Sequence, residues 1–322
     1  MSPDAASRRR RRSPARDRLE HALFRLAVGA VGLLPRGAPA ALGRTLARAY
    51  YRASGSRRRI VRQNLRHAFP DKTPEELERL GRESVGAFGA SIMDFLEISG
   101  LPEPEFRSRV SVVGLEHYDR ARALGHGLFL MSAHLGGWEL GAILGGIVGR
   151  PVVPLVRPLD NPLLERELDR LRTRFGNRVI AKRAAAKEIL KALRANEAIA
   201  ILIDQNVVAR EAVFVPFFGR LAATSPAIAL FQQKTGAPVV PVFVWPEPGG
   251  CYRVELQPPI FAEEFFGKGD RLDGDAVRLA TARYTEVTEA AIRRNPAAWL
   301  WMHDRWRTRP PGVNREPEIV NR

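Results

Sequence analysis

A histidine and a glutamate stand five positions apart in the stretch SAHLGGWEL, residues 132–140. His134 follows an apolar run that is typical of a buried strand, and Gly136 and Gly137 then allow the chain to turn. Glu139 falls in the first turn of the helix expected next, from which its carboxylate can fold back to the imidazole. A carboxylate on one ring nitrogen fixes the tautomer and makes the other nitrogen a better base for an alcohol proton. The spacing therefore predicts a general-base pair.

Structural roles for both side chains stay open at this point. A lone histidine at a strand end is commonly a hydrogen-bonded core residue, and Glu139 can simply stabilise the start of a helix. His126 is the nearest further ligand type, and no metal-ligand spacing appears. Ser132 is too close to His134 along a strand to be its nucleophile, and the sequence has no Gly-x-Ser-x-Gly elbow and no phosphate-binding glycine loop with a lysine. We therefore expect no metal and no cofactor.

Apolar strand-like runs alternate with helical segments along the body of the chain. The strands are expected at 110–114, 127–133, 151–156, 198–204, 238–245 and 252–257, and the helices between them at 115–124, 137–148, 161–175, 184–195, 225–235 and 275–294. This alternation predicts an α/β fold with a single mostly parallel or mixed sheet flanked by helices. Sites in such sheets gather at the carboxyl ends of the strands, where His134 is expected.

Charge is concentrated at the N-terminal end of the chain. The net charge is +16, and residues 1–66 hold 17 arginines and no lysine against three acids. We expect a disordered basic tail at 1–18, a membrane-associated helical arm at 19–66, the catalytic domain at 67–309 and a loose tail at 310–322. The arm is interpreted as two short amphipathic helices, divided by Pro35, on an anionic membrane surface. The alternative is that these helices cover the core of the domain.

Five blocks of sequence, in order, resemble one enzyme family. AHLGGWEL resembles the His-x4-Asp/Glu motif of glycerolipid-type acyltransferases, and its GGWE form is most similar to the late acyltransferases of lipid A biosynthesis. The blocks NLRHAFPDKTPEE, RPLDNPLLERELDRLRTRFGNRVI, LIDQNVVAREAVFVPFFGRLAATSPAIALFQQKTGAPVVPVF and PAAWLWMHDRWRTRPPG extend the resemblance from about residue 60 to residue 312.

The resemblance implies a membrane-associated O-acyltransferase of the lysophospholipid acyltransferase-like superfamily. It implies a fatty acyl thioester donor, on acyl carrier protein or as acyl-CoA, and a membrane glycolipid acceptor such as a lipid A precursor. It places the enzyme at the cytoplasmic face of the inner membrane, with His134 as general base oriented by Glu139. A phosphatidylinositol mannoside, another glycolipid or a lysophospholipid stays open as the acceptor.

Further polar residues follow the predicted strands and are candidates for substrate binding. They are Arg157, Asn161, Arg172, Asp204, Gln205, Arg220 and Thr224. The arginines can hold a phosphate or a developing oxyanion, whereas surface and helix-capping roles are the alternatives. The apolar stretch 213–220 suits either an acyl channel or the core. The tryptophans of WLWMHDRWRTRP, beside arginines, suit a membrane interface, and His303 within it is expected to be structural.

Two other classes of function were weighed. A nucleic-acid-binding protein could use the basic arm, but the remaining residues carry a net charge of only +2 and no basic–aromatic binding module, so no nucleic-acid partner is expected. An inactive lipid-binding scaffold is disfavoured by the presence of both His134 and Glu139.

Overall fold

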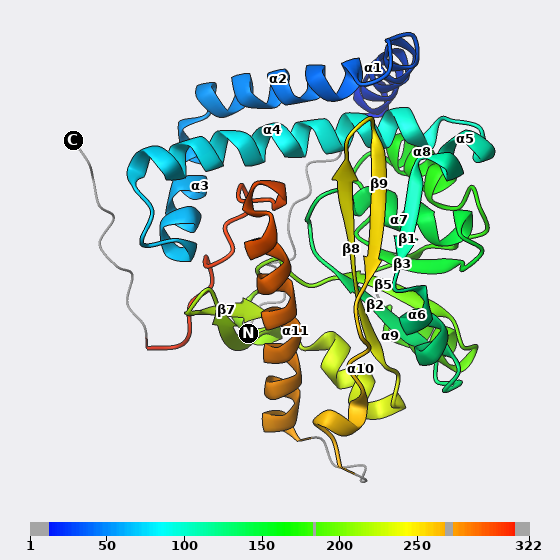
Figure 1. The fold of residues 1–322 in the computed structure, drawn as a ribbon, viewed down its shortest axis with the longest axis vertical. Helices are drawn as coiled ribbons and strands as arrows, with labels where there is room; N and C mark the ends of the chain where they lie inside the picture. The colour runs from blue at the N-terminus through cyan, green and yellow to red at the C-terminus, as the bar shows by residue number, and fades with distance from the viewer. Residues whose placement is uncertain (1–12, 183–184, 268–272, 313–322) are drawn as a thin grey trace.

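The computed structural model describes residues 13–182, 185–267 and 273–312, and they form an α/β fold (Figure 1). The helices are α1 (Pro14–Gly32), α2 (Ala38–Ala53), α3 (Gly55–Ala68), α4 (Pro74–Ser99), α5 (Glu103–Ser108), α6 (Leu115–Arg122), α7 (Trp138–Ile147), α8 (Pro162–Arg172), α9 (Ala186–Arg194), α10 (Ala227–Thr235) and α11 (Gly274–Arg294). The strands are β1 (Val110–Val113), β2 (Leu128–Ser132), β3 (Val152–Val156), β4 (Ile180–Ala181), β5 (Ala198–Leu202), β6 (Val213–Phe217), β7 (Arg220–Thr224), β8 (Val239–Glu247) and β9 (Cys251–Leu256).

Seven strands of the described residues form one mixed sheet in the order β1-β9-β8-β2-β5-β3-β4. β2 pairs in parallel with both β5 and β8, whereas β9 runs antiparallel to β8. The predicted fold class is confirmed. The hairpin of β6 and β7 was not predicted, because its two strands are joined by a tight Phe218-Gly219 turn inside one apolar stretch.

Helices cover both faces of the sheet and one end of it. α9, α10 and α11 enclose one apolar cluster with the sheet, and α6 and α7 enclose another on the opposite face. α4 and α2 run alongside each other across the end of the sheet where β8 points (Figure 1). α4 begins with a capping box in which Thr73 and Glu76 satisfy each other's backbone amides, as the Thr73-Pro74 pattern predicts.

The N-terminal helices are attached to this core in different ways. α3 buries Val61 and Leu65 completely, in the same cluster as Trp299. α2 lies on α4 through Gly43 and Gly89, where the two backbones meet without side chains between them. α3 is therefore part of the packed core, while α2 lies over α4 and reaches that core through the buried Tyr51. Of the predicted tail 1–18, residues 1–12 lie outside the described residues, and α1 already begins at Pro14.

The surface of α1 and α2 carries large apolar side chains on one helical stripe each. Leu19, Leu23 and Leu26 of α1 are 57–70% exposed, and Leu42 and Leu46 of α2 are also exposed. Among the residues that the structure describes, no helix combines the length and apolar character that crossing a bilayer requires.

We predict that Gly43→Ala destabilises the protein, because a methyl group there would stand 2.3 Å from the carbonyl oxygen of Gly89. Overpacking of this kind costs about 1–3 kcal/mol. Gly29→Ala in α1 is the matched control, since its methyl group would meet nothing within 4 Å, and replacing a helical glycine is expected to stabilise. Thermal unfolding of both variants measures the difference. Equal melting temperatures would contradict the close-packed α2–α4 contact.

Candidate active site

His134 and Asp204 come together because their strands are neighbours. β2 ends at Ser132 and β5 ends at Leu202, and the two strands are paired in parallel with these residues in register. Each polar side chain follows its strand by two residues, so both reach the same carboxyl edge of the sheet. This is the edge at which the sequence analysis places a site.

A network of backbone hydrogen bonds holds the turn after His134. Gly136 has φ +60° and donates to the carbonyl oxygen of Ala298, while Gly137 donates to that of Val244. A methyl group on Gly136 would lie 2.2 Å from the Val244 carbonyl oxygen, so only glycine fits. The carbonyl oxygen of His134 accepts a hydrogen bond from the amide of Leu300. The C-terminal segment therefore fixes the turn that carries the histidine.

The carboxylate of Asp204 binds His134 in two places. One oxygen, Oδ1, is 2.9 Å from Nδ1 of the ring, and the other, Oδ2, accepts the backbone amide of His134 at 3.0 Å. Oδ2 also accepts the indole N–H of Trp299 at 2.7 Å. Because an ionised carboxylate only accepts, Nδ1 donates its proton and Nε2 is left as the basic nitrogen.

The prediction that the Glu139 carboxylate folds back to the His134 imidazole was wrong. Glu139 does not hydrogen-bond the imidazole, because it lies in the first turn of α7 and its carboxylate is bound by Arg172 at 3.3 Å. Its charge still acts on the histidine through space. Asp204, expected to bind substrate, instead takes the orienting role.

Burial, neighbouring charges and hydrogen bonds shift the pKa of both His134 and Asp204. Burial lowers the pKa of His134, but the charge and hydrogen bond of Asp204, with the charge of Glu139, outweigh it and raise the pKa above its ordinary value. Burial alone would raise the pKa of Asp204, yet His134 and Trp299 lower it to about 2. The aspartate therefore stays ionised at neutral pH and stabilises an imidazolium that forms beside it.

Gln205 and Trp138 surround the free nitrogen of the imidazole. The amide nitrogen of Gln205 is 3.2 Å from Nε2, so it donates to the basic nitrogen in this structure. The Trp138 ring lies 5.6 Å from the imidazole, centroid to centroid, and stacks on Phe88 of α4. Gln205 is exposed, which allows its side chain to yield the position to a substrate hydroxyl.

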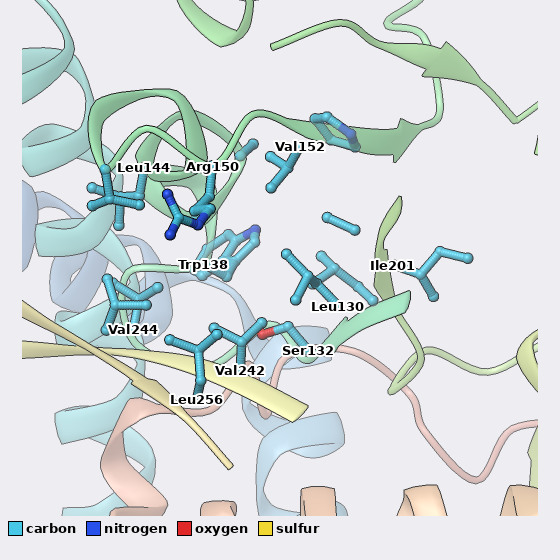
Figure 2. A pocket seen from close by; sticks show the side chains of 18 of the residues that line it. Leu130, Ser132, Trp138, Leu144, Arg150, Val152, Ile201, Val242, Val244 and Leu256 are labelled. Carbon is cyan, nitrogen blue, oxygen red and sulfur yellow. The ribbon is translucent and has the colours of Figure 1, made fainter. Parts of the chain in front are cut away.

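An apolar pocket opens next to the pair, between the sheet and α7 (Figure 2). It encloses about 990 Å³ including its open mouth. Trp138, Leu130, Val242, Leu144 and Leu256 are among the side chains that line it (Figure 2). Its polar lining residues are few and include Ser132, Glu139 and Arg172. A lining of this apolar character fits a flexible apolar chain.

Arg172 is the second charged residue that the structure brings to this pocket. Its side chain is 9% exposed and is surrounded by the carboxylates of Glu139, Glu165 and Asp169. The acidic neighbours offset its charge, and its hydrogen bond is to the Glu139 carboxylate. Its role in holding a substrate phosphate or an oxyanion stays a prediction.

Two of the predicted substrate-binding residues form hydrogen bonds within the protein. Asn161 is the N-cap of α8, and its amide nitrogen donates to the backbone of Asp17 and to Glu20 in α1. Thr224 is fully buried and accepts a hydrogen bond from Arg305. The prediction that Thr224 faces an acceptor headgroup was wrong, because β7 turns this residue into the core.

The remaining predicted residues, Arg157 and Arg220, are exposed. Arg157 follows β3 at the same edge of the sheet and is exposed, without an ion pair to any residue that the structure describes. Arg220 begins β7 and is exposed. Val215 and Phe217 of the stretch 213–220 are completely buried, and Phe217 packs against Trp299 and Trp306. Core packing, not an acyl channel, accounts for this stretch.

The C-terminal segment carries site residues that sequence reasoning missed. Trp299, Trp301 and Trp306 are 1–8% exposed, so their expected place at a membrane interface was wrong. Trp299 binds Asp204 instead. Nε2 of His303 accepts the amide of Asn206 at 2.8 Å, and burial and nearby positive charges lower the pKa of His303 to about 4. His303 thus stays neutral and holds the loop after Asp204. The closely spaced tryptophans of this segment were the signal in the sequence for functional residues. Residue type alone, however, does not distinguish a buried tryptophan from an exposed one.

A family model described as bacterial lipid A biosynthesis acyltransferase matches residues 11–308. The chain belongs to this family. The lipid A biosynthesis lauroyltransferase of Escherichia coli (strain K12) is 28% identical over 84% of this chain and 86% of that protein. The palmitoleoyltransferase of the same strain is 28% identical over 80% of each chain, and the myristoyltransferase 26% over 81% and 78%. The resemblance seen in the sequence is confirmed, and the protein is an O-acyltransferase.

We predict that Asp204→Asn lowers kcat/KM of this acyltransferase by ~10²–10⁴-fold. The two donors on Oδ2 would hold the amide oxygen, so the NH₂ group would face Nδ1 and force the proton onto Nε2. Any residual activity should have its low-pH limb shifted to lower pH, because loss of the carboxylate lowers the pKa of His134. Glu139→Gln, which leaves the Asp204 contact intact, is the matched control and should show smaller changes. A larger loss in Glu139→Gln than in a folded Asp204→Asn variant would contradict this assignment.

Proposed function

We propose that this acyltransferase moves a fatty acyl chain from an acyl thioester, carried by an acyl carrier protein, to a hydroxyl of a lipid A precursor. The observation that supports it most strongly is the His134–Asp204 pair, whose imidazole lies against Trp138 in the lining of an apolar pocket. The pair can activate an alcohol, and the pocket can hold the chain that the alcohol receives. The relatives act in lipid A biosynthesis, which supports a lipid A precursor as the acceptor.

The chemistry needs only one general base. The acceptor hydroxyl displaces the Gln205 amide from Nε2 of His134 and gives its proton to that nitrogen as its oxygen attacks the thioester carbonyl carbon. Asp204 stabilises the imidazolium on the opposite side of the ring. When the carbon–sulfur bond breaks, the imidazolium returns the proton to the leaving sulfur. The products are an ester and a thiol, and the histidine is neutral again.

Glu139 assists this cycle without touching the imidazole. Arg172 fixes its carboxylate at the pocket mouth, where its negative charge favours the imidazolium. The proposed mechanism therefore gives the two carboxylates unequal parts. Asp204 sets the tautomer and orientation of the base, and Glu139 adds electrostatic support from the pocket side.

The proposed location is the cytoplasmic face of the inner membrane. The leucine stripes of α1 and α2 lie beside arginines such as Arg25, Arg44 and Arg48, and this combination suits an anionic leaflet. α1 is tied by Asn161 to α8, which carries Arg172, so the surface that meets lipid is connected to the pocket.

We predict that the purified enzyme, given an acyl-loaded carrier protein and a tetraacylated lipid A precursor, yields a product heavier by one acyl group in mass spectrometry. His134→Ala should reduce this transfer by ~10²–10⁴-fold with the fold retained, because the base is lost. Circular dichroism provides the control for folding. Near-normal transfer by the folded variant would remove His134 from the mechanism, and a wild-type enzyme that acylates only other lipids would overturn the acceptor.

We predict that Leu23→Gln with Leu26→Gln weakens binding to liposomes that contain anionic lipid. Burying each leucine contributes roughly 1.5–3 kcal/mol, so the pair should reduce flotation more than tenfold. Leu279→Gln is the matched control, because Leu279 is equally exposed but lies on α11. If all three proteins float to the same extent, α1 is not the membrane contact.

A further inference from the structure

Helix α3 presents a stripe of arginines to solvent. Its 14 residues include five arginines and no acid. Arg59, Arg62 and Arg66 follow an i, i+3, i+7 spacing that places them on one face of the helix, opposite the buried Val61 and Leu65. All three are exposed. We call these three residues the α3 arginine stripe.

Most of the charge of the stripe is not neutralised by neighbours. Arg62 pairs with Glu78 of α4, but Arg59 and Arg66 form no ion pair with any residue of the described ranges. Arg58 and Arg82 add positive charge close by, since both act electrostatically on the same Tyr51 hydroxyl as Arg62. Exposed like charges in one area repel one another and are tolerated where they serve a partner of opposite charge.

Two hydrogen bonds fasten the buried side of α3 to the wall of the active site. The amide of Asn64 donates to the carbonyl oxygens of Trp301 at 2.9 Å and His303 at 2.7 Å. His303 in turn holds the backbone of Asn206, the residue next to Gln205 on the catalytic nitrogen. The stripe therefore projects from a helix that is linked to the base through the C-terminal segment and the loop of Gln205 and Asn206.

The exposed side chains of α3 differ in polarity from those of α1 and α2. No large apolar side chain of α3 is exposed, whereas the other two helices each expose leucines. Insertion into a leaflet needs apolar side chains as well as charge. A purely cationic stripe fits the polar surface of an acidic protein better.

We propose that the α3 arginine stripe is the docking surface for the acidic protein that carries the acyl thioester. This inference rests on the proposed function, in which such a carrier delivers the donor. Docking on α3 would bring the carrier to a helix that is hydrogen-bonded to the C-terminal segment, which in turn holds His134 and Asn206. Complementary charge would raise the rate of encounter. The apolar stripes of α1 and α2 remain available for lipid, so donor and acceptor approach over different helices.

The test compares two donors that carry the same acyl group. One is the acyl-loaded carrier protein, and the other is the uncharged S-acyl-N-acetylcysteamine thioester. Arg59→Glu with Arg66→Glu should lower kcat/KM for the carrier donor about 10–10²-fold, and wild-type kcat/KM for this donor should fall steeply with added salt. The rate with the small thioester should be unchanged.

A matched control reverses charge elsewhere on the protein. Lys191 and Arg194 are exposed on α9, which leads into the amino end of β5, the opposite edge of the sheet from His134. Lys191→Glu with Arg194→Glu changes the net charge by the same amount and should leave both rates unchanged. Circular dichroism and liposome flotation of each variant complete the comparison.

Three results with the variants would overturn the inference. The first is an equal loss with both donors in the α3 variant, which would assign the stripe to the acceptor. The second is reduced flotation with a normal carrier rate, which would assign it to the membrane. The third is an equal loss in the α9 control. A wild-type enzyme that transfers from the small thioester but not from the carrier also refutes carrier docking, whereas transfer from neither refutes the proposed function.

Discussion

The contact between the buried carboxylate of Asp204 and His134 is the interaction on which the rest of the site depends. A charge in this position is tolerated only because it is fully hydrogen-bonded, to Nδ1 and the backbone of His134 and to the Trp299 indole. That requirement explains three features of the fold. β2 and β5 must be neighbours, the glycine turn must bring the His134 amide round, and the C-terminal segment must close over the edge of the sheet. The same contacts leave Nε2 as the basic nitrogen of the imidazole.

Helix α4 connects this centre to the surface layer. Ser91 donates to the carbonyl oxygen of Gly136, and Phe88 stacks on Trp138, so the helix supports the catalytic turn from behind. On its other side α4 receives α2 through the Gly43–Gly89 contact. The arginine-rich N-terminal helices thus fall into two groups that pack differently. α1 and α2 lie outside with exposed leucines, while α3 is built into the core and exposes only polar side chains.

The periodicity of the sequence was sufficient to predict the main strands and helices, because continuous apolar runs and helical amphipathicity are local properties. His134, Asp204 and Gln205 were found for the same reason, as polar residues just after buried strands. The partner of His134 could not be predicted in this way. Glu139 is close in sequence, but Arg172 draws its carboxylate away, and Asp204 arrives from a strand 70 residues later. Likewise, Trp299, Trp301 and Thr224 have types that suit a surface role, and only the tertiary packing of β6, β7 and the C-terminal segment buries them.

The central claim is that Asp204 holds the proton of His134 on Nδ1 and leaves Nε2 free as the base. Nitrogen-15 NMR of the two ring nitrogens tests it directly, with His134→Gln used to assign the signals. At a pH above the raised pKa of His134, we predict that Nδ1 is protonated and Nε2 is unprotonated, and that the ring titrates above the ordinary histidine value. A resting enzyme with the proton on Nε2, or a His134 that titrates below the ordinary value, would contradict the account.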